Sequence, residues 1–501
     1  MQNELEALKE ILQEIYALNG VVALLGWDQQ TYMPEQGAED RGLQIEAISR
    51  MIHQKSTSDK LAKLLADLQP YTAQLDPTSD DACLIRKATR QMEKQKKVPV
   101  KWVAEFARIT TLAQSAWEKA REGSDFSAFQ PFLEQIVEKR REYASFFAPY
   151  DHIYDPQLDD FEEGMKTADV MDVFNGLRSK QVELVQRISQ CRQVEDGFLH
   201  QTFDEQNQWD FGVEVMSAIG FDWKRGRQDR TAHPFTNTIG FDDVRITTRF
   251  LTNYMPSSFF SSVHEMGHAL YEMGFKRSLG RTLLATGASM AVHESQSRLW
   301  ENLVGRSLSF WTHFYPRLQS YYPSQLKNVS MKQFYQGINQ VKPSLIRVEA
   351  DEATYNLHIM LRLELEIQML EGKVRVCDIP EAWNASMKAY LGLTPPDDAR
   401  GVLQDVHWAF GGIGYFPTYT LGNVISAQIW ETVHRDLPDL DGQIEQGKFD
   451  SLLAWLRENI HQHGAKYEPQ DLVQRVTGSK INPQPYLNYL ENKFKQIYPL
   501  D

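Results

Sequence analysis

Two histidines four residues apart, with a glutamate between them, are the residues of this sequence best suited to catalysis. His264, Glu265 and His268 follow the order His-Glu-x-x-His. Because residues four apart lie on one face of an α-helix, both imidazoles can reach the same metal ion. Glu265 would lie beside the open coordination position, where a carboxylate can take a proton from a water molecule held by the metal. The pattern predicts a hydrolytic zinc site.

A third ligand is expected downstream, because hydrolytic zinc sites usually have three protein ligands. Glu294 lies in a second predicted helix, near residues 290–305, after a glycine-bearing connection. Two helices joined in this way can pack antiparallel and direct Glu294 toward the two histidines. His293 and Glu301 are alternative ligands, since one is adjacent to Glu294 and the other lies two turns further on. We take Glu294 as the third ligand.

The elements that must position these residues are mostly helices. Apolar residues recur at threes and fours in many segments, including 40–69, 204–219, 257–274, 290–305, 350–371, 379–391, 423–435 and 484–497. Strand character is concentrated between residues 233 and 250, where β-branched residues alternate with others. The expected fold is mainly α: a large helical body split by a deep active-site groove, with a small β-sheet beside the zinc helix. Residues 1–501 are expected to form a single unit.

Several short segments together resemble the carboxypeptidase Taq family of metallocarboxypeptidases. The zinc signature of that family is similar to residues 264–268 and to residues 293–296, His-Glu-Ser-Gln. Their order and number make the resemblance specific, and the further matching segments are 27–34, 233–235 (His-Pro-Phe), 243–247, 346–351, 401–408 and 414–419. The catalytic motifs are concentrated in residues 233–420.

The resemblance implies a metal-dependent carboxypeptidase. Such an enzyme hydrolyses the C-terminal peptide bond of peptides and releases single amino acids, with one zinc ion per subunit and a zinc-held water activated by Glu265. Its partners would be peptide substrates that have a free C-terminal carboxylate. The resemblance also implies the helical fold with its groove, and a homodimer.

The reaction needs further groups near the metal. Glu265 is expected to act as general base and then to carry the proton to the leaving amine. The tetrahedral oxyanion needs a donor opposite the metal, and His407, Tyr415 and Tyr419 are the candidates. The motif match favours a functional role for His407. For the two tyrosines, packing in a Gly- and Pro-bearing stretch is an equally good interpretation.

Recognition of a free C-terminus requires a cation for its carboxylate. Arginine suits this task because its planar fork binds carboxylates bidentately. Arg347 is the first candidate and Arg245 the second; the alternatives are ion pairs with Asp351 and Asp243 respectively. His233 is a third candidate for substrate binding, because it lies in a matching motif.

Composition excludes several other classes of protein. The formal net charge of −14 disfavours nucleic-acid partners, whose phosphates need a basic surface. Three widely spaced cysteines, Cys83, Cys191 and Cys377, are typical of reduced thiols rather than of a disulfide framework. No apolar run approaches the roughly 20 residues of a membrane span, and the N-terminus lacks the pattern of a secretion signal. We therefore expect a cytoplasmic protein without membrane or nucleic-acid partners.

Two other functions remain open. One is a zinc oligopeptidase that cuts internal bonds of short peptides, and the other is a non-catalytic helical binding protein. Cobalt is a possible substitute for zinc, since two imidazoles and a carboxylate accept several divalent ions.

Overall fold

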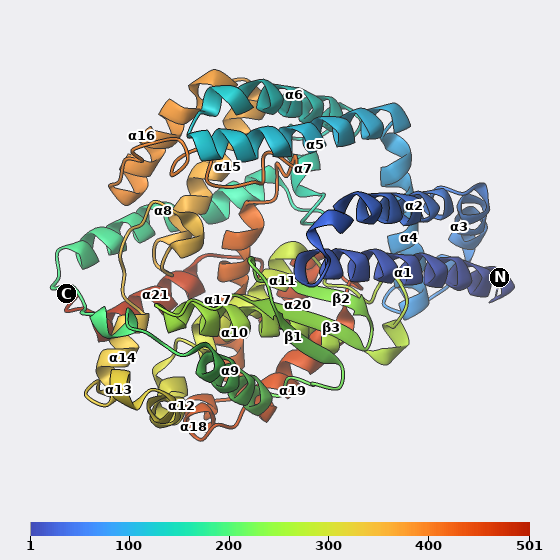
Figure 1. Cartoon of the computed structure of the whole chain (residues 1–501). Helices are drawn as coiled ribbons and strands as arrows, with labels where there is room; N and C mark the ends of the chain where they lie inside the picture. The colour runs from blue at the N-terminus through green and yellow to red at the C-terminus, as the bar shows by residue number, and fades with distance from the viewer. Residues whose placement is uncertain (1, 501) are drawn as a thin grey trace.

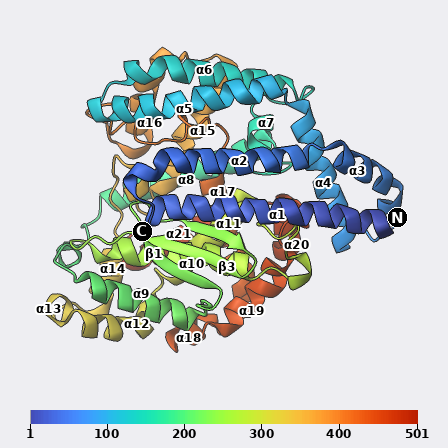
Figure 2. The same ribbon diagram turned by 45° about the vertical axis from the view of Figure 1, so that its right-hand side comes forward.

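The computed structural model describes residues 2–500 and is mainly helical, as expected (Figure 1). In Figures 1 and 2, α5 and α6 lie along one side of the molecule and α12 and α18 along the opposite side. The helices before the sheet are α1 (Gln2–Thr31), η1 (Glu35–Gly37), α2 (Ala38–Ser56), α3 (Asp59–Thr72), α4 (Asp80–Lys97), α5 (Val100–Gly123), α6 (Phe126–Ser145), α7 (Asp155–Leu158), α8 (Thr167–Ser189), η2 (Gly197–Leu199) and α9 (Glu205–Ile219).

The helices after the sheet contain the motif segments 264–268 and 293–296. They are α10 (Met255–Met273), η3 (Arg277–Leu279), α11 (Met290–Arg298), η4 (Leu299–Val304), α12 (Leu308–Tyr321), α13 (Pro323–Leu326), α14 (Met331–Ile338), η5 (Arg347–Glu349), α15 (Tyr355–Glu371), η6 (Val376–Asp378), α16 (Ile379–Leu391), α17 (Pro417–Asp436), α18 (Leu440–Glu445), α19 (Asp450–Asn459), η7 (His461–His463), α20 (Pro469–Thr477) and α21 (Gln484–Ile497). None of the helices in residues 2–500 combines the length and the apolar character of a membrane span.

Two predicted helices differ from the observed ones. The segment 40–69 forms α2 and α3 rather than one helix, because Ser58 caps a new helix by accepting a hydrogen bond from Leu61 N. The segment 290–305 is α-helical only to Arg298 and continues as the π-helical turn η4. Such turns rotate the following side chains relative to a regular helix.

The small sheet has the order β1-β3-β2 and lies beside α1 and α10 (Figure 2). β3 (Asp243–Thr248) pairs with β1 (Gly226–Arg230) in parallel and with β2 (Thr236–Gly240) in antiparallel. β1 was not predicted, because its residues are polar or glycine and lack the β-branched alternation that indicates a strand. The outer edge of β2 is covered by α1, where Asn237 Nδ2 donates a hydrogen bond to Ala23 O at 2.7 Å.

Two separate apolar cores support this arrangement. The larger core contains residues from α5 onward and surrounds α10, α11 and α17. The smaller core joins α1, α3 and α4 through residues such as Leu8, Leu65 and Ile85, and it also includes Leu279 and Leu284. Because Leu279 and Leu284 belong to the connection between α10 and α11, the N-terminal helices are anchored directly beside the predicted metal helices.

Glycines let the helices around the predicted metal residues cross closely. A Cβ on Gly267 of α10 would lie 2.7 Å from Ser297 Cα, and one on Gly422 of α17 would lie 2.6 Å from Glu294 Cγ. Carbon atoms normally approach only to about 3.5–4.0 Å, so a side chain at either position would push α11 away. The neighbouring backbone thus explains the glycine within the His-Glu-x-x-His helix.

Candidate metal centre and active site

His264, His268 and Glu294 are brought together between α10 and α11. Glu294 Oε2 lies 3.5 Å from His264 Nε2 and 3.4 Å from His268 Nε2. Ligand atoms bound tetrahedrally at about 2.0–2.1 Å from a common ion are roughly 3.3–3.4 Å apart, so these separations fit a single zinc-sized ion. The three side chains form a group that could hold a metal. The donor set, two imidazoles and one carboxylate, is the type found in hydrolytic zinc sites.

Each of these three side chains is also held on its outer side. His264 Nδ1 lies 2.8 Å from Glu301 Oε2, and His268 Nδ1 lies 2.6 Å from His293 Nδ1. Arg298 Nε donates a hydrogen bond to Glu294 Oε1 at 2.7 Å. These contacts leave Nε2 of both imidazoles and Oε2 of the carboxylate facing one another. Both alternative ligands, Glu301 and His293, therefore lie behind the histidines and outside the group of three.

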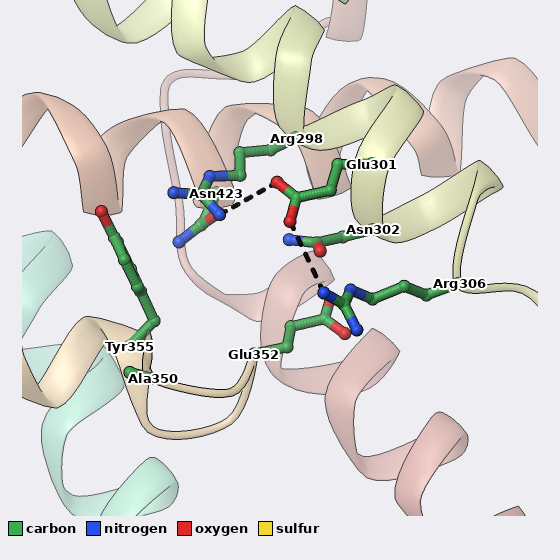
Figure 3. A pocket seen from close by; sticks show the side chains of 8 residues that line it. All are labelled: Arg298, Glu301, Asn302, Arg306, Ala350, Glu352, Tyr355 and Asn423. Atoms are coloured by element: carbon green, nitrogen blue, oxygen red, sulfur yellow. Dashed lines mark hydrogen bonds and ion pairs between the residues drawn. The ribbon is translucent and has the colours of Figure 1, made fainter. Parts of the chain in front are cut away.

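Arg298 contacts both the proposed ligand Glu294 and Glu301, the partner of His264. Besides Glu294, it donates a hydrogen bond to Glu301 Oε2 at 3.2 Å, and Glu301 Oε1 lies 3.6 Å from Arg306 Nη2 (Figure 3). Burial raises the pKa of the Glu301 carboxyl, but Arg298 and His264 outweigh it and lower that pKa to about 2. Arg298 likewise helps to hold the pKa of Glu294 well below its usual range despite burial. Both carboxylates are therefore ionised, which favours a bound cation.

Sequence reasoning did not assign a role to Arg298. Its spacing of four residues from Glu294 is the helical interval for an acid–base pair, and that spacing could have indicated the contact. The contact to Glu301 could not be found in this way, because η4 changes the helical period between the two residues.

Glu265 lies on the buried side of α10, next to the sheet. Glu265 is 7% exposed, and this burial raises the pKa of its carboxyl above the usual value. Thr236, the first residue of β2, donates from Oγ1 to Glu265 Oε2 at 2.7 Å. The small sheet thus contacts the predicted general base directly.

The three candidates for oxyanion stabilisation lie close together: His407, Tyr415 and Tyr419. His407 Nε2 and Tyr419 Oη are 3.1 Å apart, and the Tyr415 and Tyr419 rings are 5.4 Å apart. Burial and the nearby charge of Glu294 raise the pKa of Tyr415 to about 12, so its hydroxyl keeps its proton. Burial lowers the pKa of His407 to about 3, so its imidazole is neutral. Besides burial, the charge of Glu294 contributes to the raised pKa of both Tyr415 and Tyr419.

Arg347 is almost fully buried, and its partner differs from the one expected. Its Nε and Nη2 donate to Asp405 Oδ1 at 3.0 and 2.8 Å, and its Nη1 donates to Tyr355 Oη at 2.9 Å. The expected alternative, Asp351, instead accepts hydrogen bonds from backbone N–H groups, including that of Thr354. The sequence could not distinguish the two acids, because Asp405 is distant in sequence and reaches Arg347 only through the tertiary fold.

The opposite oxygen of Asp405 is occupied as well. Arg362, which is fully buried, donates from Nε and Nη2 to Asp405 Oδ2 at 2.8 and 2.5 Å. Asp405 thus lies between two arginines, where it fixes the orientation of Arg347.

Arg245 and His233 lie apart from this cluster. Arg245 forms a two-point ion pair with Asp243, at 2.8 Å for both contacts, and its guanidinium covers the Trp27 ring at 4.4 Å. That pair is the structural alternative expected from the sequence. His233 is exposed in the segment between β1 and β2. Arg245 thus contacts α1 through Trp27.

Two cavities are lined in part by residues that contact the proposed metal ligands. One, of about 20 Å³, is lined mainly by polar side chains of the Arg298 and Glu301 region (Figure 3). The other, of about 320 Å³, lies between α4, residues 159–163 and residues 286–293, and His293 forms part of its wall. The larger cavity is thus bounded by α4 on one side and by His293, which contacts His268, on another.

Comparison with known proteins decides the family. A family model described as carboxypeptidase Taq (M32) metallopeptidase matches residues 7–494. The chain belongs to this family. Among relatives of this M32 chain, thermostable carboxypeptidase 1 of Thermus thermophilus is 40% identical over 501 residues, and carboxypeptidase 1 of Bacillus subtilis is 38% identical over 492 residues. In both comparisons 98% of each chain is covered.

Solved structures agree with the sequence relatives. The M32 carboxypeptidase from Deinococcus radiodurans R1 superposes with a TM-score of 0.96 at 39% identity, over 99% of this chain and 100% of that chain. The M32 chain described here is therefore a metallocarboxypeptidase, an enzyme that hydrolyses the C-terminal peptide bond of peptides and requires a divalent metal. The resemblance seen in the sequence, the helical fold and the predicted reaction are confirmed.

Proposed function

We propose that His264, His268 and Glu294 bind one zinc ion per chain and that Glu265 is the general base. The observation that carries this proposal is the 3.4–3.5 Å separation between Glu294 Oε2 and the two imidazole Nε2 atoms. A zinc ion supplies two effects when bound: it lowers the pKa of water and polarises the scissile carbonyl. Cobalt is the alternative, because the same donors accept several divalent ions.

Glu265 would move one proton during the reaction. It takes the proton from the attacking water and delivers it to the nitrogen of the leaving amino acid, so the carboxyl returns to its ionised form. Burial, which raises its pKa, supports this role, because a base with a raised pKa accepts and releases protons more evenly near neutral pH.

We assign stabilisation of the developing oxyanion to the cluster of His407, Tyr415 and Tyr419, with Tyr415 as first choice. Its phenol keeps its proton, because burial and the charge of Glu294 raise its pKa, so it can donate a hydrogen bond to the developing negative charge. His407 and Tyr419, in contact with each other, would hold that phenol in place.

Arg347 is the proposed anchor for the substrate's C-terminal carboxylate. Of its five N–H groups, three donate to Asp405 and Tyr355. One N–H on each terminal nitrogen remains, and a pair of this kind can bind a carboxylate bidentately. Arg245 and His233 are the second and third candidates, and the ion pair of Arg245 with Asp243 makes it the weaker choice.

One assay tests the metal requirement, the general base and the oligopeptidase alternative. An N-terminally blocked peptide is offered as free acid and as C-terminal amide, before and after chelation, and then with zinc or cobalt added back. We expect release of the C-terminal residue from the free acid only, loss on chelation, and recovery with metal. Equal cleavage of the amide would support an oligopeptidase. Activity that persists in Glu265→Gln would reject the proposed base.

We further propose that the enzyme is a cytoplasmic homodimer in which residues 1–501 work as one unit. The family resemblance supports the dimer, the three free cysteines support a reducing compartment, and the match of one family model to residues 7–494 supports a single unit. Sedimentation velocity of the purified enzyme tests the dimer, and a monomer at micromolar concentration would reject it.

A further inference from the structure

The hydroxyl of Thr236 touches Glu265 at two points. Oγ1 is 2.7 Å from Glu265 Oε2 and 2.9 Å from the backbone O of the same residue. One hydroxyl proton is available, and the shorter contact is to the carboxylate, which is the stronger acceptor. The hydroxyl therefore donates to the Glu265 carboxylate while it lies beside the backbone O of the same residue.

Thr236 is itself held firmly. It is the first residue of β2 and pairs with Ile246 of the central strand β3. The side chain of Ile246 is fully buried. Threonine is branched at Cβ, so its χ1 has few accessible values and the hydroxyl direction is well defined. The next residue, Asn237, attaches the strand to α1. The hydroxyl thus comes from a rigid element rather than from a mobile loop.

Only one of the two carboxylate oxygens of Glu265 is hydrogen-bonded. Oε2 accepts from Thr236, whereas Oε1 has no hydrogen-bond partner among residues 2–500. A carboxylate fixed through one oxygen cannot rotate freely about its last bond, so the other oxygen keeps a constant direction. A general base needs this property, because proton transfer depends on a heavy-atom separation of about 2.6–3.2 Å and on alignment.

We propose that Thr236 is a positioning residue for catalysis: its hydroxyl orients Glu265 so that Oε1 faces the attacking water. The inference rests on the proposed role of Glu265 as general base. When Glu265 holds on Oε1 the proton taken from water, Oε2 remains an acceptor and the Thr236 hydroxyl continues to donate to it. The side chain then remains tethered in both protonation states, and Thr236 itself gains and loses no proton.

The competing explanation is that Thr236 only joins the sheet to α10. That explanation predicts a loss of folding stability and metal content on substitution, without a specific effect on turnover. Thr238 provides a matched control, because it lies two residues along the same strand and therefore on the same face, and it has no side-chain hydrogen bond within residues 2–500.

The test compares Thr236→Val, which keeps the shape and removes the hydroxyl, with Thr236→Ser, which keeps the hydroxyl. The readouts are kcat and KM for a blocked peptide, bound zinc, and Tm, with Thr238→Val as the control. Thr236→Ala is the second variant if the valine variant fails to fold. Glu265→Gln is measured in parallel.

We expect Thr236→Val to lower kcat about tenfold or more with KM within about twofold, and to keep its zinc and its Tm. Thr236→Ser should recover most of the activity, and Thr238→Val should match the native enzyme. An unchanged kcat in Thr236→Val overturns the inference, as does a loss that Thr236→Ser fails to restore or that follows zinc content or Tm. If Glu265→Gln stays active, the proposed general base is wrong, which is a separate outcome.

Discussion

Gly422 of α17 lies directly against the side chain of Glu294 on α11, where a Cβ at position 422 would come within 2.7 Å of Glu294 Cβ and 2.6 Å of Glu294 Cγ. Because Gly422 has no side chain, the backbone of α17 packs directly against Glu294, the proposed third metal ligand, and confines it on that side. Together with Arg298, which holds its Oε1, this contact fixes the direction of Oε2.

Gly422→Ala should therefore displace Glu294 and weaken metal binding. Overpacking of a dense interior costs about 1–3 kcal/mol, and part of that strain is expected to move the ligand oxygen. We expect zinc affinity, measured by competition with a chelating dye, to fall about tenfold or more. Gly212→Ala is the control, because it lies inside α9 with nothing within 4 Å of its added Cβ. It should leave zinc affinity unchanged and raise stability slightly. Equal zinc affinity in all three proteins would contradict the role of Gly422.

Glu301→Gln should weaken zinc binding without removing a ligand. The Glu301 carboxylate lies against His264 Nδ1, and such a partner orients the ring and makes Nε2 more basic. Loss of partners of this kind commonly lowers metal affinity by about 10- to 100-fold. Glu205→Gln serves as control, since that partly exposed carboxylate pairs with the exposed Arg230 rather than with a metal residue. The prediction fails if both variants bind zinc as tightly as the native enzyme.

Glu162 should make the fold less stable at alkaline pH. Burial raises the pKa of its carboxyl to about 8, although the Ser289 hydroxyl and the Ala291 N–H lower it in part. The folded state then holds a proton that the unfolded state releases near its ordinary pKa of 4.5. The proton on Glu162 therefore contributes fully to the free energy of unfolding below about pH 4.5, and this contribution is lost as the pH rises through about 8.

Glu162→Gln tests this dependence, because glutamine imitates the protonated acid and can still accept from Ala291 N. The free energy of unfolding of the native enzyme should fall from about pH 6 to about pH 9, and that of the variant should fall less. The two curves are measured by urea unfolding with zinc at constant excess. Parallel curves would show that Glu162 does not hold a proton in the folded state.

Zinc should stabilise the fold as well as activate the enzyme. A ligand that binds only the folded state adds about 4 kcal/mol at a thousand times its Kd. Chelation should therefore lower Tm, and added zinc should restore it. In Glu294→Ala the rise of Tm with zinc should be much smaller, since one of three ligands is missing. A zinc response of native size in that variant would place the metal elsewhere.

The sequence could predict those site residues that lie a few positions apart within one helix. His264, Glu265 and His268 share a helix, and the four-residue interval alone places both imidazoles on one face. The helix carrying Glu294 was also predictable from its pattern, although its continuation as a π-helical turn was not. Thr236 could not be recognised as a partner of Glu265, because the two are joined only when β2 packs against α10.

The sequence by itself determined the chemistry: the His-Glu-x-x-His helix, the candidate third carboxylate, the family and the mainly helical fold. These follow from side-chain type and from spacing within single helices, which depend on short-range geometry. The tertiary structure alone decided which groups hold that chemistry in place, namely Glu301 and His293 behind the imidazoles, Asp405 rather than Asp351 on Arg347, and Gly422 against Glu294. Those contacts join residues on different elements, and their partners are selected by how the helices cross, which no local pattern encodes.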